Sequence, residues 1–237
     1  MSETPLTVGV LGGMSSQSTV EYYRLLDDGI NEALGGHHAA DLAIRSVDFG
    51  QIERYIAEER WDEAGAFLAD AARDVEAAGA DFVVMATNTM HRVAPAIEDA
   101  LSVPFVHIVD ATAEAIGADG IDTVGVLGTA AVMNGDFYAD RFADYGIDVI
   151  TPDDEARTLV DDVIFEELTS GVIRDASREA YLRIIDDLVD AGADGVVLGC
   201  TEIELLVTQS DRPEVPLFDT TALHVERAVE YSLHGVR

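Results

Sequence analysis

The stretch AGADGVVLGCTEIELL, residues 191–206, contains Cys200, the only cysteine in the chain. Its apolar run, residues 196–198, predicts a buried strand, and residues 202–206 predict the start of the next helix. Cys200 therefore comes directly after a strand. Because open α/β sheets bind their ligands at the carboxyl ends of the strands, we expect Cys200 to belong to a functional site.

The same pattern occurs a second time, in AGADFVVMATNTMH, residues 78–91. This earlier stretch repeats AGAD and the apolar run, and it has Thr87 at the position that corresponds to Cys200. Two further pairs of segments recur at a similar spacing. They are TVGVLG at 7–12 and 123–128, and VPFVHIVDATAEA at 103–115 with VPLFDTTALHVERA at 215–228.

The spacing between the paired segments, 112 to 116 residues, is too long for a solenoid or propeller repeat. It is the length of a domain, so we predict two similar halves that face each other. We expect the first in residues 1–118 and the second in residues 119–237. The C-terminal helix, from about residue 220, is free to pack back on the first half. A chain of 237 residues is long enough for two small domains.

Predicted strands alternate with predicted helices in both halves. This alternation is typical of the α/β class with parallel sheets. We therefore predict two similar Rossmann-like domains related by pseudo-two-fold symmetry, with the site in the cleft between them. Ser18 or Thr19 is expected to cap the first helix. The predicted strands are 7–12, 42–47, 81–86, 103–107, 123–128, 149–150 and 196–198, and the main later helices are 61–79, 133–145, 157–170 and 177–190.

The charge balance is strongly acidic. The chain has 46 Asp and Glu residues against 14 basic residues, all of them arginine, and its formal net charge is −32. The acidic residues are spread along predicted helices, which argues against a disordered tail. Such a surface repels itself in dilute buffer, but the Debye length falls to ~3 Å at 1 M salt. We therefore expect a halophilic, salt-filled cytoplasm and no nucleic-acid partner.

Other features also favour a cytoplasmic protein. No apolar run approaches the ~20 residues of a membrane helix, and the N-terminus lacks the pattern of a signal peptide. A lone cysteine cannot form an internal disulfide. The lack of a long apolar run also means that we expect no membrane partner. Adjacent His37 and His38 have no third ligand at a suitable spacing, so we expect no metal.

The two matched strand ends suggest a reaction. If a two-fold axis relates the halves, Thr87 and Cys200 lie opposite each other, and the amides and hydroxyls beside them suit a small carboxylate. A racemase needs two proton carriers on opposite faces of one carbon. One carrier removes the α-proton, and the other delivers a proton from the far side.

Several motifs carry a resemblance to a known family. They are Gly12-Gly13-Met14-Ser15 followed by Ser18-Thr19, Thr87-Asn88-Thr89-Met90-His91, Leu198-Gly199-Cys200-Thr201-Glu202-Ile203 and Phe218-Asp219-Thr220-Thr221. Together they resemble the aspartate/glutamate racemase family over nearly the whole chain. The resemblance implies two similar α/β domains, a small amino-acid substrate, no cofactor and, commonly, a homodimer.

In most members of that family both strand-end positions are cysteine, whereas Thr87 matches a Thr/Cys subgroup. That subgroup includes broad-specificity amino-acid racemases and an L-aspartate/glutamate racemase. The resemblance implies that Cys200 and Thr87 are the two catalytic acid/base groups. The residues expected to bind the substrate are Asn88, Thr89 and Thr201 at the α-carboxylate, together with Met14 and Thr129. Gln51, expected in the loop after the second strand, is the neutral polar candidate for the substrate side chain.

Thr87 is the weaker acid of the pair, because a thiol has a pKa near 8.5 and a threonine hydroxyl ionises far less readily. His91, one helical turn later, could assist Thr87, or it could simply cap and pack the helix. The helix start after Cys200 would activate the thiol, whereas the neighbouring Glu202 would act in the opposite direction. We therefore expect unequal behaviour toward the two enantiomers.

The missing lysine excludes a pyridoxal-phosphate racemase, which needs a lysine Schiff base. The resemblance also admits hydantoin racemases, maleate isomerases and arylmalonate decarboxylases. A Cys–His hydrolase using Cys200 and His91, and a non-catalytic amino-acid binder, stay open as other classes. Arg45 and Arg92 are the nearest candidates in sequence for an acidic side chain, although a surface or ion-pair role explains each of them better. Dicarboxylic amino acids are the first expected substrates, with neutral ones second.

Overall fold

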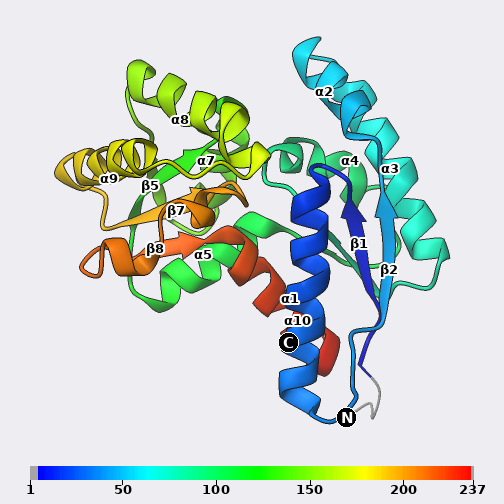
Figure 1. The fold of residues 1–237 in the computed structure, drawn as a ribbon. Helices are drawn as coiled ribbons and strands as arrows, with labels where there is room; N and C mark the ends of the chain where they lie inside the picture. The colour runs from blue at the N-terminus through cyan, green and yellow to red at the C-terminus, as the bar shows by residue number, and fades with distance from the viewer. Residues whose placement is uncertain (1–4, 236–237) are drawn as a thin grey trace. The chain divides into compact units, whose positions relative to one another are not determined.

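The computed structural model of this 237-residue chain describes residues 5–235. The chain divides into two compact units (Figure 1). Unit 1 contains the chain up to Ile108 and again from His224 onward, and unit 2 is Val109–Leu223. The repeat boundary expected after residue 118 stays a prediction.

Unit 1 is a four-stranded parallel sheet with helices on both faces. Its elements are β1 (Val8–Gly12), α1 (Ser16–Leu34), β2 (Leu42–Ser46), α2 (Phe49–Ala57), α3 (Trp61–Ala77), β3 (Phe82–Met85), the 3₁₀ helix η1 (Thr89–Val93), α4 (Ala94–Glu98) and β4 (Phe105–Val106). The strand order is β2-β1-β3-β4. The C-terminal helix α10 (Thr220–His234) starts in unit 2 and continues in unit 1 from His224.

The core of unit 1 lies on the two faces of this sheet. On one face, Tyr22 and Leu26 of α1 and Tyr231 of α10 pack against β1 and β3. On the other face, Leu68 and Val75 of α3 pack against the same strands. Figure 1 shows α1 and α10 side by side, with α3 behind β1 and β2. Burial of these apolar stripes is the main stabilising contribution to the unit.

Unit 2 repeats this design. Its elements are α5 (Ile108–Ala118), β5 (Thr123–Gly128), α6 (Ala130–Met133), α7 (Asp136–Ala143), β6 (Asp148–Ile150), α8 (Asp154–Glu166), η2 (Leu168–Ser170), α9 (Asp175–Asp190), β7 (Gly195–Gly199), η3 (Ile203–Leu205), η4 (Gln209–Asp211) and β8 (Leu217–Asp219). The strands are parallel in the order β6-β5-β7-β8, and α8 and α9 pack on one face. The predicted α/β class with two parallel sheets is confirmed.

The repeated TVGVLG segments form corresponding strands, β1 and β5, and their glycines allow close packing. A Cβ atom on Gly9 would lie 2.5 Å from Val75 Cγ1 of α3. A Cβ atom on Gly125 would lie 2.8 Å from Leu188 Cδ1 of α9. Glycine at both positions lets a helix approach the central strand of its sheet.

Some local predictions differ from the structure, and the helix expected over 133–145 is divided into α6 and α7. The first helix begins at Ser16, because the Ser15 hydroxyl accepts a hydrogen bond from the Ser18 amide and caps the helix in place of Ser18 or Thr19. Gln51, expected in a loop, lies on α2, because the Asp48 carboxylate caps that helix at Gly50. The helix expected over 202–206 is only the 3₁₀ turn η3. Among the described residues, no helix has the length and apolar character needed to span a membrane.

Candidate active site

The carboxyl end of β1 turns sharply into α1. Gly13 has a φ of +94°, and a Cβ atom there would lie 2.2 Å from the Val47 carbonyl oxygen, so only glycine fits. The Gly13 amide donates to Thr19 Oγ1 at 2.7 Å. Met14, predicted to bind the substrate, is buried at this turn. No acidic residue occupies the first turn of α1, which keeps its amide end favourable for an anion.

Thr87 follows β3 in unit 1 and is buried, as is Asn88, while Thr89 begins η1. The ring of His91 holds the main chain here, since its Nδ1 lies 2.7 Å from the Thr87 carbonyl oxygen. Its Nε2 accepts from the Ile108 amide at 3.3 Å. A carbonyl only accepts and an amide N–H only donates, so these contacts fit the neutral ring with its proton on Nδ1. His91 thus supports the backbone of Thr87 through both ring nitrogens.

Cys200 follows β7 in unit 2 and is half-buried. Its thiol donates to Glu202 Oε2 at 3.1 Å. The Thr201 hydroxyl donates to the same oxygen at 2.5 Å. The Glu202 side chain is buried, and one of its carboxylate oxygens accepts both of these hydrogen bonds within unit 2.

The electrostatic surroundings of Cys200 favour the neutral thiol. Burial raises the pKa of Cys200 well above its usual value, and the charge of Glu202 raises it further. The charge of Asp161 acts in the same direction. A thiol in this environment is protonated at neutral pH, and it ionises only when another group takes the proton.

Two residues near Cys200 were missed by sequence reasoning. Asp161 of α8 accepts a hydrogen bond from the Ala130 amide at 2.6 Å, and thereby caps the helix that follows Thr129. Tyr138 of α7 is buried, and burial together with the charge of Cys200 raises its pKa. Asp161 is one acidic residue among many on predicted helices, and Tyr138 is one aromatic residue on an apolar stripe. Neither carried a distinguishing signal.

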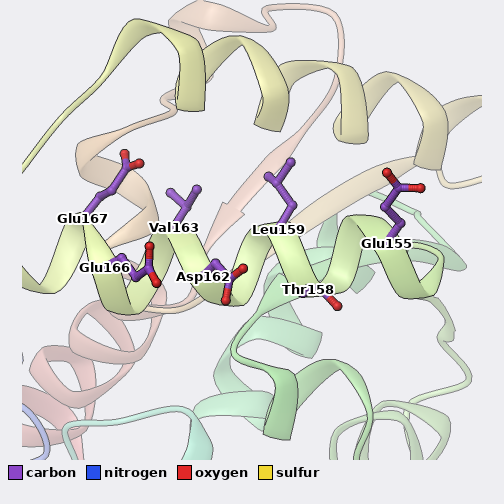
Figure 2. Close-up of a pocket in the computed structure, with 7 residues that line it drawn as sticks. All are labelled: Glu155, Thr158, Leu159, Asp162, Val163, Glu166 and Glu167. Atoms are coloured by element: carbon purple, nitrogen blue, oxygen red, sulfur yellow. The ribbon is translucent and has the colours of Figure 1, made fainter.

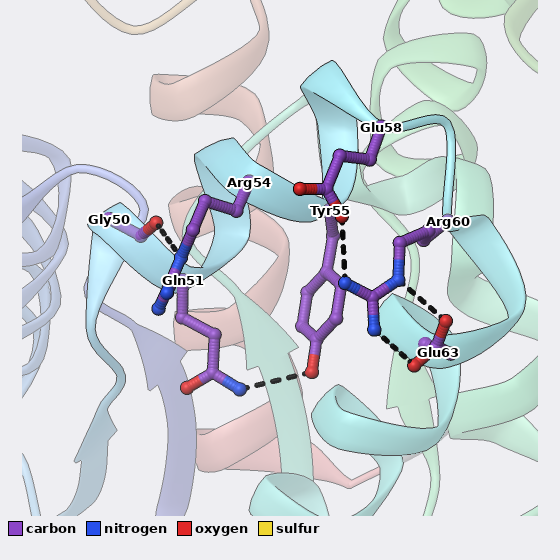
Figure 3. Close-up of polar contacts among 7 residues, drawn as sticks. All are labelled: Gly50, Gln51, Arg54, Tyr55, Glu58, Arg60 and Glu63. Atoms are coloured by element: carbon purple, nitrogen blue, oxygen red, sulfur yellow. Dashed lines mark hydrogen bonds and ion pairs between the residues drawn. The ribbon is translucent and has the colours of Figure 1, made fainter.

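The predicted contacts to a substrate side chain have partners in unit 1. Gln51 Nε2 donates to the Tyr55 hydroxyl at 3.0 Å, as Figure 3 shows. Arg45 pairs with Asp74 on the surface. Arg92 stacks on Trp61, with its guanidinium carbon 4.2 Å from the ring centre. Both arginines therefore have structural contacts of their own.

A groove along α8 is a poor place for an amino-acid carboxylate. It has a volume of about 460 Å³, and Figure 2 shows that most of its polar side chains are carboxylates. Its lining residues are Glu155, Thr158, Leu159, Asp162, Val163, Glu166 and Glu167. Across residues 5–235, no three His, Cys, Asp or Glu side chains are grouped to hold a metal ion.

Comparison with known proteins identifies the family. The family model of Asp/Glu/hydantoin racemases matches residues 11–228. A proposed Asp/Glu racemase from Yersinia pestis is 46% identical, with a TM-score of 0.91, over 97% of this chain and 100% of that chain. An aspartate racemase homologue from Pyrococcus horikoshii is 32% identical, with a TM-score of 0.85, over 96% of this chain and 99% of that chain.

Curated relatives agree with this assignment. A glutamate racemase from Roseiflexus is 35% identical over 153 residues, which are 62% of this chain and 54% of that protein. A broad-specificity amino-acid racemase from Bacillus subtilis is 24% identical over 226 residues, which are 91% of this chain and 93% of that protein. The chain belongs to the Asp/Glu/hydantoin racemase family.

Proposed function

We propose that this protein is a cofactor-independent amino-acid racemase in which Thr87 and Cys200 are the opposed acid/base groups. The observation that carries the proposal is the Cys200 thiol at a strand end, hydrogen-bonded to a buried carboxylate 3.1 Å away. A protonated thiol beside a carboxylate can become a thiolate by passing its proton to that carboxylate, so no proton has to leave for the solvent. Thr87 occupies the corresponding strand end of the other sheet.

The proton transfers balance over a full cycle through bulk water. Glu202 takes the thiol proton of Cys200, and the thiolate then removes the substrate α-proton. The Thr87 hydroxyl delivers a proton to the opposite face of the α-carbon as the carbanion forms. In the reverse direction the Thr87 oxygen removes the α-proton, and the Cys200 thiol supplies the new one. After a forward turnover water takes the proton from Glu202 and gives one to the Thr87 oxygen, and the reverse direction starts with the opposite exchange.

The substrate α-carboxylate needs donors close to both strand ends. We assign this role to Asn88, Thr89 and Thr201, with the amide end of α1 near Met14 as an additional positive partial charge. Thr129, which follows β5 and precedes α6, is assigned to the substrate as well, and the Asp161 carboxylate caps α6 at the Ala130 amide.

Acidic amino acids fit the side-chain contacts best. Gln51 offers an amide on α2, and Arg54 lies one turn further along the same helix. Arg54 Nε donates to the Gly50 carbonyl, and within the described chain no carboxylate lies at ion-pair distance from this guanidinium. In a chain of net charge −32, such an arginine is a good partner for a distal carboxylate. Neutral amino acids stay the second choice.

Exchange of the α-proton in deuterated buffer tests the proposal. L- and D-aspartate, L- and D-glutamate and a neutral panel would be followed by NMR at molar salt, with Cys200→Ala as the control. Exchange that depends on Cys200 is expected. A folded protein that exchanges no amino acid would instead favour a non-catalytic binder or another reaction of the superfamily, such as hydantoin racemisation, maleate isomerisation or decarboxylation.

The cellular setting is part of the same proposal. We infer a cytoplasmic homodimer adapted to high salt. The salt adaptation follows from the net charge of −32, because salt must screen the repulsion between the acidic side chains. Circular dichroism across a salt series should show structure lost below a few hundred millimolar salt, and a salt-independent melting temperature would contradict it. Light scattering at molar salt would measure the mass of the assembly.

A further inference from the structure

A buried tyrosine–histidine pair lies in the interior of unit 1. The Tyr22 hydroxyl of α1 is 2.7 Å from Nδ1 of His224, a residue 202 positions later on α10. Nε2 of His224 is 2.8 Å from the Val106 carbonyl oxygen on β4. The carbonyl can only accept, so Nε2 carries the proton, and Nδ1 of the neutral ring accepts from Tyr22. The pair thus ties two helices to the edge strand.

A chain of contacts connects this pair to Thr87 by way of His91. The rings of His224 and His91 meet edge to face, with their centres 5.9 Å apart at 73°. His91 in turn holds the Thr87 carbonyl oxygen from Nδ1 and accepts the Ile108 amide at Nε2. His107 also packs against His91, with ring centres 4.5 Å apart. His91, His107 and His224 are all buried.

Cys200 has different neighbours. The carboxylate of Glu202 accepts its thiol proton directly, and the charge of Asp161 also acts on it. A carboxylate can take up a proton from Cys200, whereas the hydrogen-bonded rings near Thr87 hold the backbone of Thr87 in place. The two strand ends are therefore supported by different means.

We propose that Tyr22 and His224 are positioning residues for Thr87, and that they serve only the proton transfer made by Thr87. This inference rests on the proposed racemase function. Tyr22 holds the ring of His224, and the ring of His224 limits the position of His91, which orients the Thr87 backbone. Misplacing a reacting group by about 1 Å costs on the order of 100-fold in rate, so a partial loss of support should be measurable.

The test variant is Tyr22→Phe, which removes one hydroxyl and leaves the ring. Tyr23→Phe is the matched control, because Tyr23 is the next residue on α1 and is exposed. Rates of racemisation cannot separate the two proton transfers, since an equilibrium constant of one forces equal kcat/KM in both directions. Exchange of the α-proton with solvent is therefore measured separately for each enantiomer.

Two further variants assign the faces. The enantiomer whose exchange is lost in Thr87→Val is the one served by Thr87, and the enantiomer whose exchange is lost in Cys200→Ala is the one served by Cys200. In Tyr22→Phe we expect exchange of the Thr87-served enantiomer to fall about 10-fold, with that of the other enantiomer changed less than 2-fold. Tyr23→Phe should match the parent protein for both.

A second substitution protects the test against a folding defect. His224→Gln retains an amide N–H that can donate to the Val106 carbonyl, whereas His224→Phe does not. We expect His224→Gln to keep more of the Thr87-served exchange than His224→Phe, at equal near-ultraviolet circular dichroism.

The outcomes separate the two proposals. Equal losses for both enantiomers in Tyr22→Phe, or no loss in either, would overturn the positioning role. Absence of exchange in the parent protein, or full exchange of both enantiomers in Thr87→Val, would overturn the proposed function itself.

Discussion

The two matched strand ends have the same place in their sheets but opposite chemical surroundings. Thr87 follows β3 and Cys200 follows β7, and each of these is an inner strand that pairs with the TVGVLG strand of its sheet. Behind Thr87 lie hydrogen-bonded imidazole rings, whereas Cys200 contacts the carboxylate of Glu202. The repeat places Thr89 where the second half has Glu202, and His91 where it has Glu204, so both positions contribute to the contrast. A duplicated fold thus has a hydrogen-bonded carboxylate at one strand end and hydrogen-bonded imidazole rings at the other.

Substitution of Thr87 has the largest expected effect on the comparison. Thr87→Val keeps the shape of the side chain and removes the hydroxyl, so we expect racemisation to fall on the order of 1,000-fold. Thr87→Ser keeps the hydroxyl and should stay within about 10-fold of the parent rate, when polarimetry follows the loss of optical rotation. Comparable rates for the Val and Ser variants would remove Thr87 from the chemistry.

The carboxylate beside Cys200 provides the next test. The charge of Glu202 raises the pKa of Cys200, so Glu202→Gln should lower that pKa while burial still holds it above the usual range. Alkylation by iodoacetamide, which requires the thiolate, should then begin at a lower pH than in the parent protein. Racemisation should nevertheless fall roughly 10- to 100-fold, because the proton acceptor is lost.

Glu214→Gln, on an exposed loop of unit 2, is the control for this change. It should leave both the alkylation profile and the rate unaltered. An unshifted profile in Glu202→Gln, or a shift to higher pH, would be incompatible with the hydrogen bond between Cys200 and Glu202.

The paired glycines compare the packing of the two units. At Gly9 a new methyl group would meet Val75, Ala80 and the Phe82 carbonyl oxygen, all within 3.0 Å. At Gly125 the three nearest atoms all belong to Leu188, and the nearest of them, Cδ1 at 2.8 Å, is the flexible end of that side chain. We expect Gly9→Ala to lower the free energy of unfolding by about 2–3 kcal/mol and Gly125→Ala by about 1 kcal/mol. Chemical denaturation at fixed molar salt measures both, and the reverse order would refute this account.

The smallest expected effect concerns two neighbouring threonines of α10, both fully buried. The Thr220 hydroxyl donates to the Leu198 carbonyl at 2.9 Å, so Thr220→Val should lower the free energy of unfolding by about 1–2 kcal/mol. The Thr221 hydroxyl is the buried side-chain group without a hydrogen-bond partner in the described chain. Thr221→Val should be neutral or stabilise by up to about 1 kcal/mol. The sequence repeat already places Val109 at the corresponding position of the first half.

The sheets and strand ends were predictable because their signals are local. An apolar run bounded by AGAD and a polar residue locates both β3 and β7, and the TVGVLG repeats locate β1 and β5. Helix starts were less predictable, because Ser15 and Asp48 compete as caps with residues nearby. The contact between Tyr22 and His224 joins residues 202 positions apart, so no local sequence pattern predicts it and it is known only from the folded structure.

Trp61 gives unit 1 an optical signal that unit 2 lacks. It is the only tryptophan in the chain, it begins α3, and the guanidinium of Arg92 covers its ring. Tryptophan emission therefore follows unfolding of unit 1 alone, whereas far-ultraviolet circular dichroism follows the helices of both units. Coincident curves from the two signals would mean that the units melt as one cooperative body. Separate curves would yield the stability of each unit from the unlabelled, unmodified protein.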